Sequence, residues 1–196
     1  ELIKKRRTVR SDYENALLKQ EDVSFLINNE PELIHYFPNN SKEHLWLNEQ
    51  TIEANRLQSY RDAAQKELSE WIRFSSKDAE QHCDGLTTAS MEMEGFPSWL
   101  LRNFYNQSSV MKKGFREKGI DKVKKQVSQS AGWLLITSKD QSVQTLLETG
   151  KRMQRLFLKV RERSIAIHPM TQILEESSTN QQLYQSIGVN DTVQFL

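Results

Sequence analysis

The chain has 196 residues, 37% of them hydrophobic and 27% charged, which is enough for one globular domain or two closely packed halves. Its formal net charge of +1 argues against a strongly basic nucleic-acid-binding protein. Cys83 is the single cysteine, which excludes an internal disulfide and fits a reducing, cytoplasmic location. No apolar run approaches the roughly 20 residues of a membrane helix, so we expect neither a membrane nor a nucleic acid among the partners.

Five cationic side chains lie within residues 2–10. An arginine binds a phosphate through two parallel hydrogen bonds, and a neighbouring threonine hydroxyl can donate a further one. Arg6, Arg7, Thr8 and Arg10 are therefore candidates for an anion site. An isolated cluster of this kind is more often a solvated helix end, and both interpretations stay open at this point.

The next part of the chain predicts two helical regions around a strand. Apolar residues within 23–29 mark a short helix that ends at Asn28-Asn29, and residues 32–37 are typical of a strand. Residues 41–74 are strongly helical, with a break expected near Ser59. The apolar residues expected on the buried side of this long stretch are Leu45, Ile52, Leu57, Tyr60, Ala64, Leu68, Trp71 and Ile72.

Residues 86–130 are the least regular part of the chain, and their first half is rich in aromatic residues and methionine. Such a segment is most often core or subunit interface, but it can also form a lid over a flat ligand. The basic run over 112–125 lacks interleaved aromatic residues, so a solvated face is favoured over nucleic-acid binding. Cys83 follows His82, but neither a set of metal ligands nor a partner base is present, which favours a structural or incidental cysteine.

A strand, a long helix and a second strand follow one another after this segment. Residues 131–137 predict a buried strand, and residues 142–163 predict an amphipathic helix that begins at a serine cap. Gly150 lies on the apolar face of this helix and suggests close packing against another backbone, whereas Arg152 lies on another face. Residues 164–168 then predict a second strand.

The end of the chain predicts a short helix and a last strand. Thr179 begins a capping box, Gly188 ends the helix, and residues 189–196 alternate as a strand does. The predicted order of elements is α+β, a small sheet wrapped by helices. Because the chain opens on Glu1 rather than Met and ends within a predicted strand, we expect a fragment of a longer protein.

Three stretches together resemble the flavin-dependent nitroreductase family, and most of all its Acg-type branch, in which two nitroreductase-like halves are fused. Residues 3–10 are similar to the family's opening Arg-Arg-Ser/Thr-x-Arg signature, residues 132–156 to its strand and central helix, and residues 167–172 to its loop beside the flavin ring. The resemblance spans residues 1–196, which look like the C-terminal half. It implies a small, mostly antiparallel sheet wrapped by helices around one long central helix, and FMN as the cofactor.

The resemblance assigns eight residues to FMN. Those that would contact the phosphate and the ribityl chain are Arg6, Arg7, Thr8 and Arg10. Those that would lie along the isoalloxazine, with one backbone N–H donating toward N5, are Pro169, Met170, Thr171 and Gln172. A donor at N5 stabilises the charge that develops there on reduction, so no catalytic acid or base is required.

The implied activity is hydride transfer from NAD(P)H through the flavin to a nitro-aromatic, a quinone or a similar acceptor. Two alternatives stay open: a flavin-sequestering protein without turnover, and an inert half that serves as a partner. The family's Ser/Asn-Gln-Pro-Trp segment and its last phosphate-site arginine are missing from this sequence. We therefore expect a homodimer or a second nitroreductase-like half to complete the site, with a lid drawn from residues 86–130.

Overall fold

Three strands form one antiparallel sheet in the computed structural model, which describes residues 1–27 and 30–196. The middle strand β2 (Gly132–Ser138) pairs with β1 (Ile34–Pro38) on one side and with β3 (Thr192–Phe195) on the other. The α+β class with a small antiparallel sheet is therefore confirmed. The predicted helix end at Asn28-Asn29 lies outside the described residues.

Most of the remaining chain is helical, and residue contacts divide it into two compact units. The sheet unit comprises residues 1–54 and 126–196, and the helical unit comprises residues 55–125. The chain passes between them within α3 and α8. The helices are α1 (Leu2–Lys5), α2 (Gln20–Ile27), α3 (Lys42–Tyr60), α4 (Asp62–Trp71), α5 (Ser76–His82), α6 (Gly95–Phe104), α7 (Gln107–Val110), α8 (Lys113–Gln129), α9 (Val143–Glu162), α10 (Gln172–Glu175) and α11 (Ser177–Ile187).

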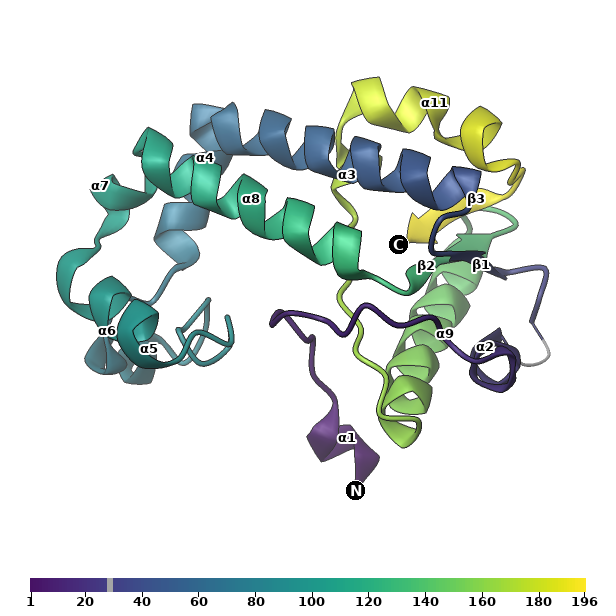
Figure 1. Cartoon of the computed structure of the whole chain (residues 1–196), viewed down its shortest axis with the longest axis horizontal. Coiled ribbons are helices and arrows are strands. Elements are labelled where there is room, and N and C mark those ends of the chain that lie inside the picture. The colour runs from purple at the N-terminus through teal and green to yellow at the C-terminus, as the bar shows by residue number, and fades with distance from the viewer. Residues whose placement is uncertain (28–29) are drawn as a thin grey trace. The chain divides into compact units, whose positions relative to one another are not determined.

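The sheet unit is layered, with α9 on one face of the sheet and α11 and the first half of α3 on the other (Figure 1). Leu135 of β2 is fully buried, as expected for the middle strand of a sheet that is covered on both faces. A core cluster joins α2, β2 and α9 through Leu26, Ile136, Leu156 and Val160. These side chains remove apolar surface from water, which is the main stabilising contribution to the unit.

Helix α9 has the predicted bounds but is not central along its whole length. Its cap is Ser142, whose Oγ accepts a hydrogen bond from the Thr145 N–H at 3.3 Å. Val143 and Leu147 in the first turns are 76% and 58% exposed. Gly150 is exposed as well, and a Cβ built there meets no described atom within 4 Å, so the close packing expected at this glycine is wrong for this chain.

The basic face of α9 holds α2, a role that the sequence analysis did not predict. Arg152 is buried at 8% exposure, and its Nη2 lies 3.2 Å from Glu30 Oε1. Lys159 Nζ donates to the Leu26 carbonyl at 3.2 Å, where the carbonyl groups at the C-terminal end of α2 attract cations. Arg163 lies 3.6 Å from Asp22. The expectation that Arg152 faces away from the core is therefore wrong.

The predicted strand over 164–168 is wrong, because the chain leaves α9 through a C-terminal capping turn. Ser164 adopts the left-handed conformation with φ of 55°, and its N–H donates to the Arg161 carbonyl. The Ile165 N–H donates to the Val160 carbonyl at 2.8 Å, and these two bonds define a Schellman motif. Beyond it the chain joins no ladder of the described sheet, and the Ile167 carbonyl accepts a hydrogen bond from the Val9 N–H instead.

Replacing Ser164 with glycine is expected to stabilise the sheet unit by about 1 kcal/mol, because glycine adopts positive φ without the strain of a Cβ. The measurement is the midpoint of chemical denaturation of the two proteins. Ser24→Gly in the middle of α2 is the matched control, and there the same replacement should destabilise by about 0.5 kcal/mol. A lower midpoint for Ser164→Gly would contradict this account of the turn.

Helix α11 begins earlier than the predicted capping box, which is therefore wrong. Its first residue is Ser177, and its N-cap Glu176 makes no side-chain capping bond. The Thr179 hydroxyl instead donates to the Ile173 carbonyl at 2.9 Å, which ties α11 to α10. Gly188 ends the helix with φ of 66°, as predicted.

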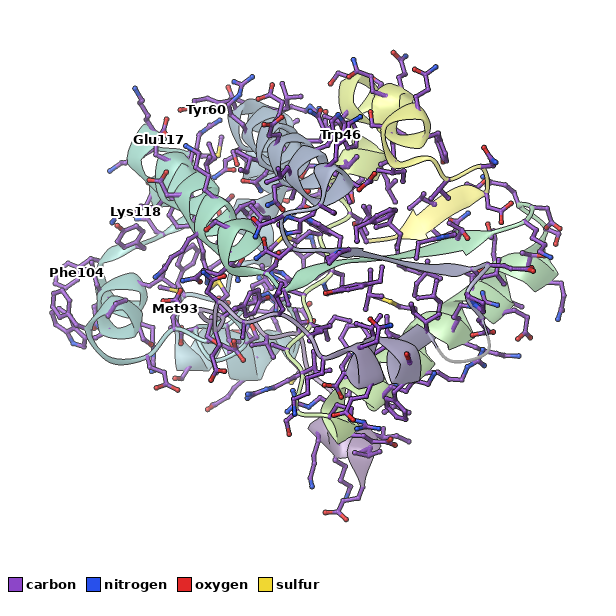
Figure 2. All side chains as sticks on the ribbon, turned by 45° about the vertical axis from the view of Figure 1, so that its right-hand side comes forward. Trp46, Tyr60, Met93, Phe104, Glu117 and Lys118 are labelled. Atoms are coloured by element: carbon purple, nitrogen blue, oxygen red, sulfur yellow. The ribbon has the colours of Figure 1, made fainter. Side chains whose placement is uncertain are left out.

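A buried arginine connects the segments of the helical unit. Arg116 on α8 donates to the carbonyls of Ser59 and Met111 and pairs with Asp62 at 2.8 Å. Tyr60 donates to Glu117, and both residues are labelled in Figure 2. Because Arg116 satisfies two backbone carbonyls, it belongs to the structure of this unit rather than to an anion site.

The break near Ser59 is confirmed, since α3 ends at Tyr60 and α4 begins at Asp62. The buried face expected for these helices is partly wrong. Leu45, Tyr60 and Trp71 are exposed, because the buried sides of α3 and α4 pass through polar as well as apolar residues. The buried residues of α3 are His44, Leu47, Thr51 and Ala54.

The irregular segment 86–130 does not coincide with either unit, since its last five residues belong to the sheet unit. Phe96, Trp99 and Phe104 of α6 are exposed, and their rings contact one another at centroid distances of 5.6 and 5.3 Å.

Among the described helices, none combines the length and apolar character needed to cross a bilayer.

Candidate functional site

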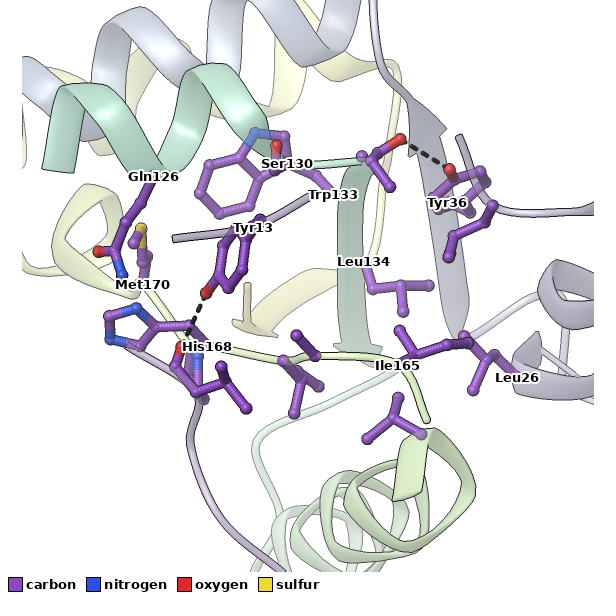
Figure 3. Close-up of a pocket in the computed structure, with 18 of the residues that line it drawn as sticks. Tyr13, Leu26, Tyr36, Gln126, Ser130, Trp133, Leu134, Ile165, His168 and Met170 are labelled. Atoms are coloured by element: carbon purple, nitrogen blue, oxygen red, sulfur yellow. Dashed lines mark hydrogen bonds between the residues drawn. The ribbon is translucent and has the colours of Figure 1, made fainter. Parts of the chain in front are cut away.

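A cavity of about 460 Å³ lies in the sheet unit, between β2 and α9. Its walls come from residues 9–18, α2, β1, the end of α8, β2, α9, residues 164–170 and the last two residues of the chain. Figure 3 shows how side chains from these distant segments point into one space. The walls are mainly apolar, and the charged side chains among the described wall residues are the exposed Asp12 and Glu14. The cavity therefore suits an uncharged, largely apolar group.

The structure brings the basic opening of the chain beside the segment that follows α9. The Val9 N–H donates to the Ile167 carbonyl at 2.9 Å, and the Tyr13 hydroxyl donates to the Val9 carbonyl at 2.8 Å (Figure 3). Val9, Pro169 and Met170 all contribute to the cavity wall. Two segments that are about 160 residues apart in sequence thus meet at one cavity.

The four predicted phosphate ligands lie next to this cavity rather than in its wall. The Arg6 guanidinium lies 4.1 Å from the centre of the Phe157 ring on α9, a cation–π contact at the C-terminal half of that helix. Arg7 is exposed, and Thr8 and Arg10 are half-buried. Gln126 Nε2 donates to the Arg10 carbonyl at 2.8 Å and fixes the backbone there.

The four predicted ring contacts divide into two pairs. Pro169 and Met170 line the cavity, but the Met170 N–H donates to the Leu196 carbonyl at 2.9 Å and Pro169 has no N–H. Thr171 and Gln172 form the start of α10, where backbone N–H groups have no partner within the helix. Gln172 Oε1 is buried, and no hydrogen-bond partner for it lies within the described part of the chain.

Several side chains in the cavity wall were not predicted as site residues. Tyr36 donates from its hydroxyl to the Ala131 carbonyl at 2.9 Å, and burial raises the pKa of this phenol. A Cβ at Gly132 would lie 2.5 Å from the Phe37 carbonyl oxygen, so glycine is required where the two strands meet. Alternation along the strands could have found Tyr36, but nothing in the sequence pointed to Ser130.

Ser130 and Trp133 in the cavity wall are linked by a chain of hydrogen bonds through two residues of α3, His44 and Asn48. Trp133 Nε1 donates to Asn48 Oδ1 at 2.8 Å, which turns the Asn48 amide nitrogen toward His44 Nδ1 at 3.4 Å. His44 Nδ1 is then an acceptor, so Nε2 carries the proton and donates to Ser130 Oγ at 3.1 Å. The Ser130 hydroxyl in turn donates to the Val127 carbonyl at 3.0 Å.

This arrangement excludes Ser130 as a nucleophile that His44 activates, because a general base must accept the proton of the hydroxyl. Burial lowers the pKa of His44, which favours the same neutral form. In residues 1–27 and 30–196, no three His, Cys, Asp or Glu side chains lie close enough together to hold a metal ion.

Compared with protein-family models, curated proteins and solved structures, the chain matches none. The nitroreductase resemblance therefore stays a prediction, and the arguments for function that follow come from the cavity and its neighbouring residues.

Proposed function

We propose that this chain binds FMN and belongs to a nitroreductase-like oxidoreductase that passes hydride from NAD(P)H to a nitro-aromatic, a quinone or a similar acceptor. The observation that carries the proposal is the 2.9 Å hydrogen bond between Val9 and Ile167 beside the apolar cavity. This bond brings the basic segment, which would bind the phosphate, next to the segment before α10, which would contact the ring of the same ligand.

The residues present fit the two ends of such a ligand. An uncharged ring system matches a cavity of about 460 Å³ with apolar and aromatic walls. The carboxylates of Asp12 and Glu14 oppose a phosphate inside the cavity, so the phosphate would stay outside it. Arg6 and Arg10 lie on either side of the wall residue Val9 in the sequence and outside the cavity lining, where charge-assisted hydrogen bonds to a phosphate can form.

The segment at the start of α10 narrows the choice of the backbone donor for the ring. Because Pro169 has no N–H and that of Met170 is bonded to Leu196, the donor toward N5 would be Thr171 or Gln172. FMN, when bound, supplies the hydride chemistry, and the chain positions the ring and excludes water from it.

The exposed apolar start of α9 supports a second subunit or a second nitroreductase-like half. Val143, Leu146 and Leu147 form an exposed patch on one side of the helix, and exposed apolar patches are typical of interfaces. Such a partner would supply the part of the flavin site that is missing from this sequence. The lid role of residues 86–130 remains part of the same proposal.

The test is the colour of the full-length protein. An enzyme of this kind should purify with FMN, absorb near ~450 nm and bleach when NADPH is added under anaerobic conditions. A flavin-sequestering protein would hold FMN that NADPH fails to reduce, and an inert half would take up no flavin even after incubation with excess FMN. Colourless protein that remains free of flavin would overturn the proposal.

A further inference from the structure

Ser130 and Trp133 form part of the wall on the same side of the cavity (Figure 3). Ser130 follows the end of α8 and Trp133 is the second residue of β2. The side chains of both are held by hydrogen bonds to residues of α3. His44 holds the hydroxyl of Ser130, and Asn48 holds the indole N–H of Trp133. The two holding residues contact each other, so neither wall residue is fixed independently.

In the hydrogen bonds that link Trp133, Asn48 and His44, the donor and the acceptor of each bond are defined. Indole nitrogen only donates, so Asn48 must present its oxygen to Trp133 and its amide NH₂ to His44. His44 can accept that bond only while its Nδ1 carries no proton. A proton taken from solvent onto Nδ1 would leave two donors facing each other across 3.4 Å.

We propose that His44 is a positioning residue for the cavity, whose protonation releases Asn48 and with it the Trp133 side of the wall. When Nδ1 is protonated, the Asn48 amide must turn to present its oxygen to His44, and this movement removes the acceptor of the Trp133 indole. A ring in the cavity is thereby held more weakly in acid. The flavin-binding part of this inference rests on the proposed function, whereas the movement of Trp133 does not.

The surroundings of His44 favour this behaviour. Its described hydrogen-bond partners are the Ser41 hydroxyl at the backbone N–H, Asn48 and Ser130, and none of these is charged. Burial alone accounts for the lowered pKa of this imidazole. The protonated form therefore becomes populated below about pH 6.5, the ordinary value for histidine, and not above it.

His168 also lines the cavity, and His35 of β1 is a second histidine whose pKa burial lowers while Asp191 raises it. Both are imidazole side chains, so each needs its own variant as a control. His35 lies outside the cavity wall, is half-buried and contacts Thr137 Oγ1 at 3.5 Å, which makes it the control for a histidine without a link to Trp133.

The first experiment follows the indole N–H signal of Trp133 by NMR in the ligand-free full chain, assigned by its loss in Trp133→Phe. We expect the signal to shift and broaden below about pH 6.5 in the natural sequence and in His35→Gln. It should stay constant in His44→Gln, which keeps a donor toward Ser130 but cannot titrate. A shift that persists in His44→Gln would overturn the inference.

The second experiment measures binding of lumiflavin, the flavin ring without phosphate, by quenching of its fluorescence. Affinity should be about fivefold weaker near pH 5.5 than near pH 7.5, and His44→Gln should abolish the difference while His35→Gln and His168→Gln retain it. A pH effect that disappears only in His168→Gln would contradict a role for His44. If Trp133 responds as expected but lumiflavin binds at neither pH, the proposed flavin site fails and the positioning role of His44 stands.

Discussion

Replacing Arg6 and Arg10 together with alanine is expected to weaken FMN binding by about 3 kcal/mol, or more than a hundredfold. Each charge-assisted hydrogen bond to a phosphate contributes about 1.5–3 kcal/mol, and the lower figure applies because Arg6 is exposed. The dissociation constant is measured by quenching of FMN fluorescence at fixed ionic strength. Lumiflavin binding should change little in the same variant, because the ring lacks the phosphate.

The matched control removes two other positive charges, which lie in the neighbouring helix α1. Lys4 and Lys5 belong to α1, and Lys5 pairs with Glu1 at 3.3 Å on the surface. Alanine at both positions should reduce FMN affinity only through long-range attraction, by less than about fivefold at physiological salt. Equal losses in the two double variants would mean that the arginines act as general charge, and unchanged affinity would return the cluster to a solvated helix end.

Arg6 also has a structural role, so its variants need a stability measurement. Its guanidinium covers the ring of Phe157, a buried residue of α9. Arg6→Lys keeps the charge but loses the planar stacking on that ring. Thermal unfolding of each variant separates a loss of phosphate contacts from a loosening of α1.

Local patterns were sufficient for β2 and α9. The apolar run over 131–137 and the serine cap before a long amphipathic stretch each depend on residues within a few positions of one another. The faces of the helices were less predictable, because burial is decided by distant partners. Arg152 is buried since Glu30 and α2 meet it there, and Leu147 is exposed since nothing in the described chain covers it.

The segment after α9 shows why β-favouring residues alone do not make a strand. Ile165 and Ile167 have the side chains of a strand, but their backbone groups bond outside the sheet, since the Ile165 N–H donates to the Val160 carbonyl and the Ile167 carbonyl accepts from the Val9 N–H. The Schellman motif at Ser164 directs the chain past the cavity instead. A serine at a left-handed position conceals this turn, because glycine is the usual signal for it.

The cavity was beyond sequence reasoning because its wall is assembled from segments far apart in the chain. Pro169 and Met170 are expected beside a ligand only through the family resemblance, and both line the cavity. No sequence pattern connects His44 with Trp133, which are 89 positions apart and are linked in the described structure through Asn48. Such networks depend on tertiary packing, so a single sequence carries no periodic signal for them.

The contact between Glu30 and Arg152 is expected to respond unequally to the loss of its two members. Glu30→Ala should destabilise the sheet unit by about 2 kcal/mol, because it leaves a guanidinium at 8% exposure whose Nε already has no hydrogen-bond partner among the described residues. This loss of stability is smaller than for a fully enclosed ion pair, since the Glu30 side chain is 33% exposed and water can replace part of its contact with Arg152. Urea denaturation of each variant measures the free energy of unfolding.

Arg152→Met should cost less than about 1 kcal/mol, because methionine keeps the apolar stem and removes the buried charge. Glu30 then retains Arg155 at 3.5 Å. Adding Glu30→Ala to Arg152→Met should therefore have little further effect, whereas independent contributions would simply add. Glu148→Ala is the control, since it breaks an exposed pair with Lys151 on the same helix and should change stability by less than about 0.5 kcal/mol. A larger loss from Arg152→Met than from Glu30→Ala would mean that the guanidinium is held mainly by Thr149 and the core rather than by the carboxylate.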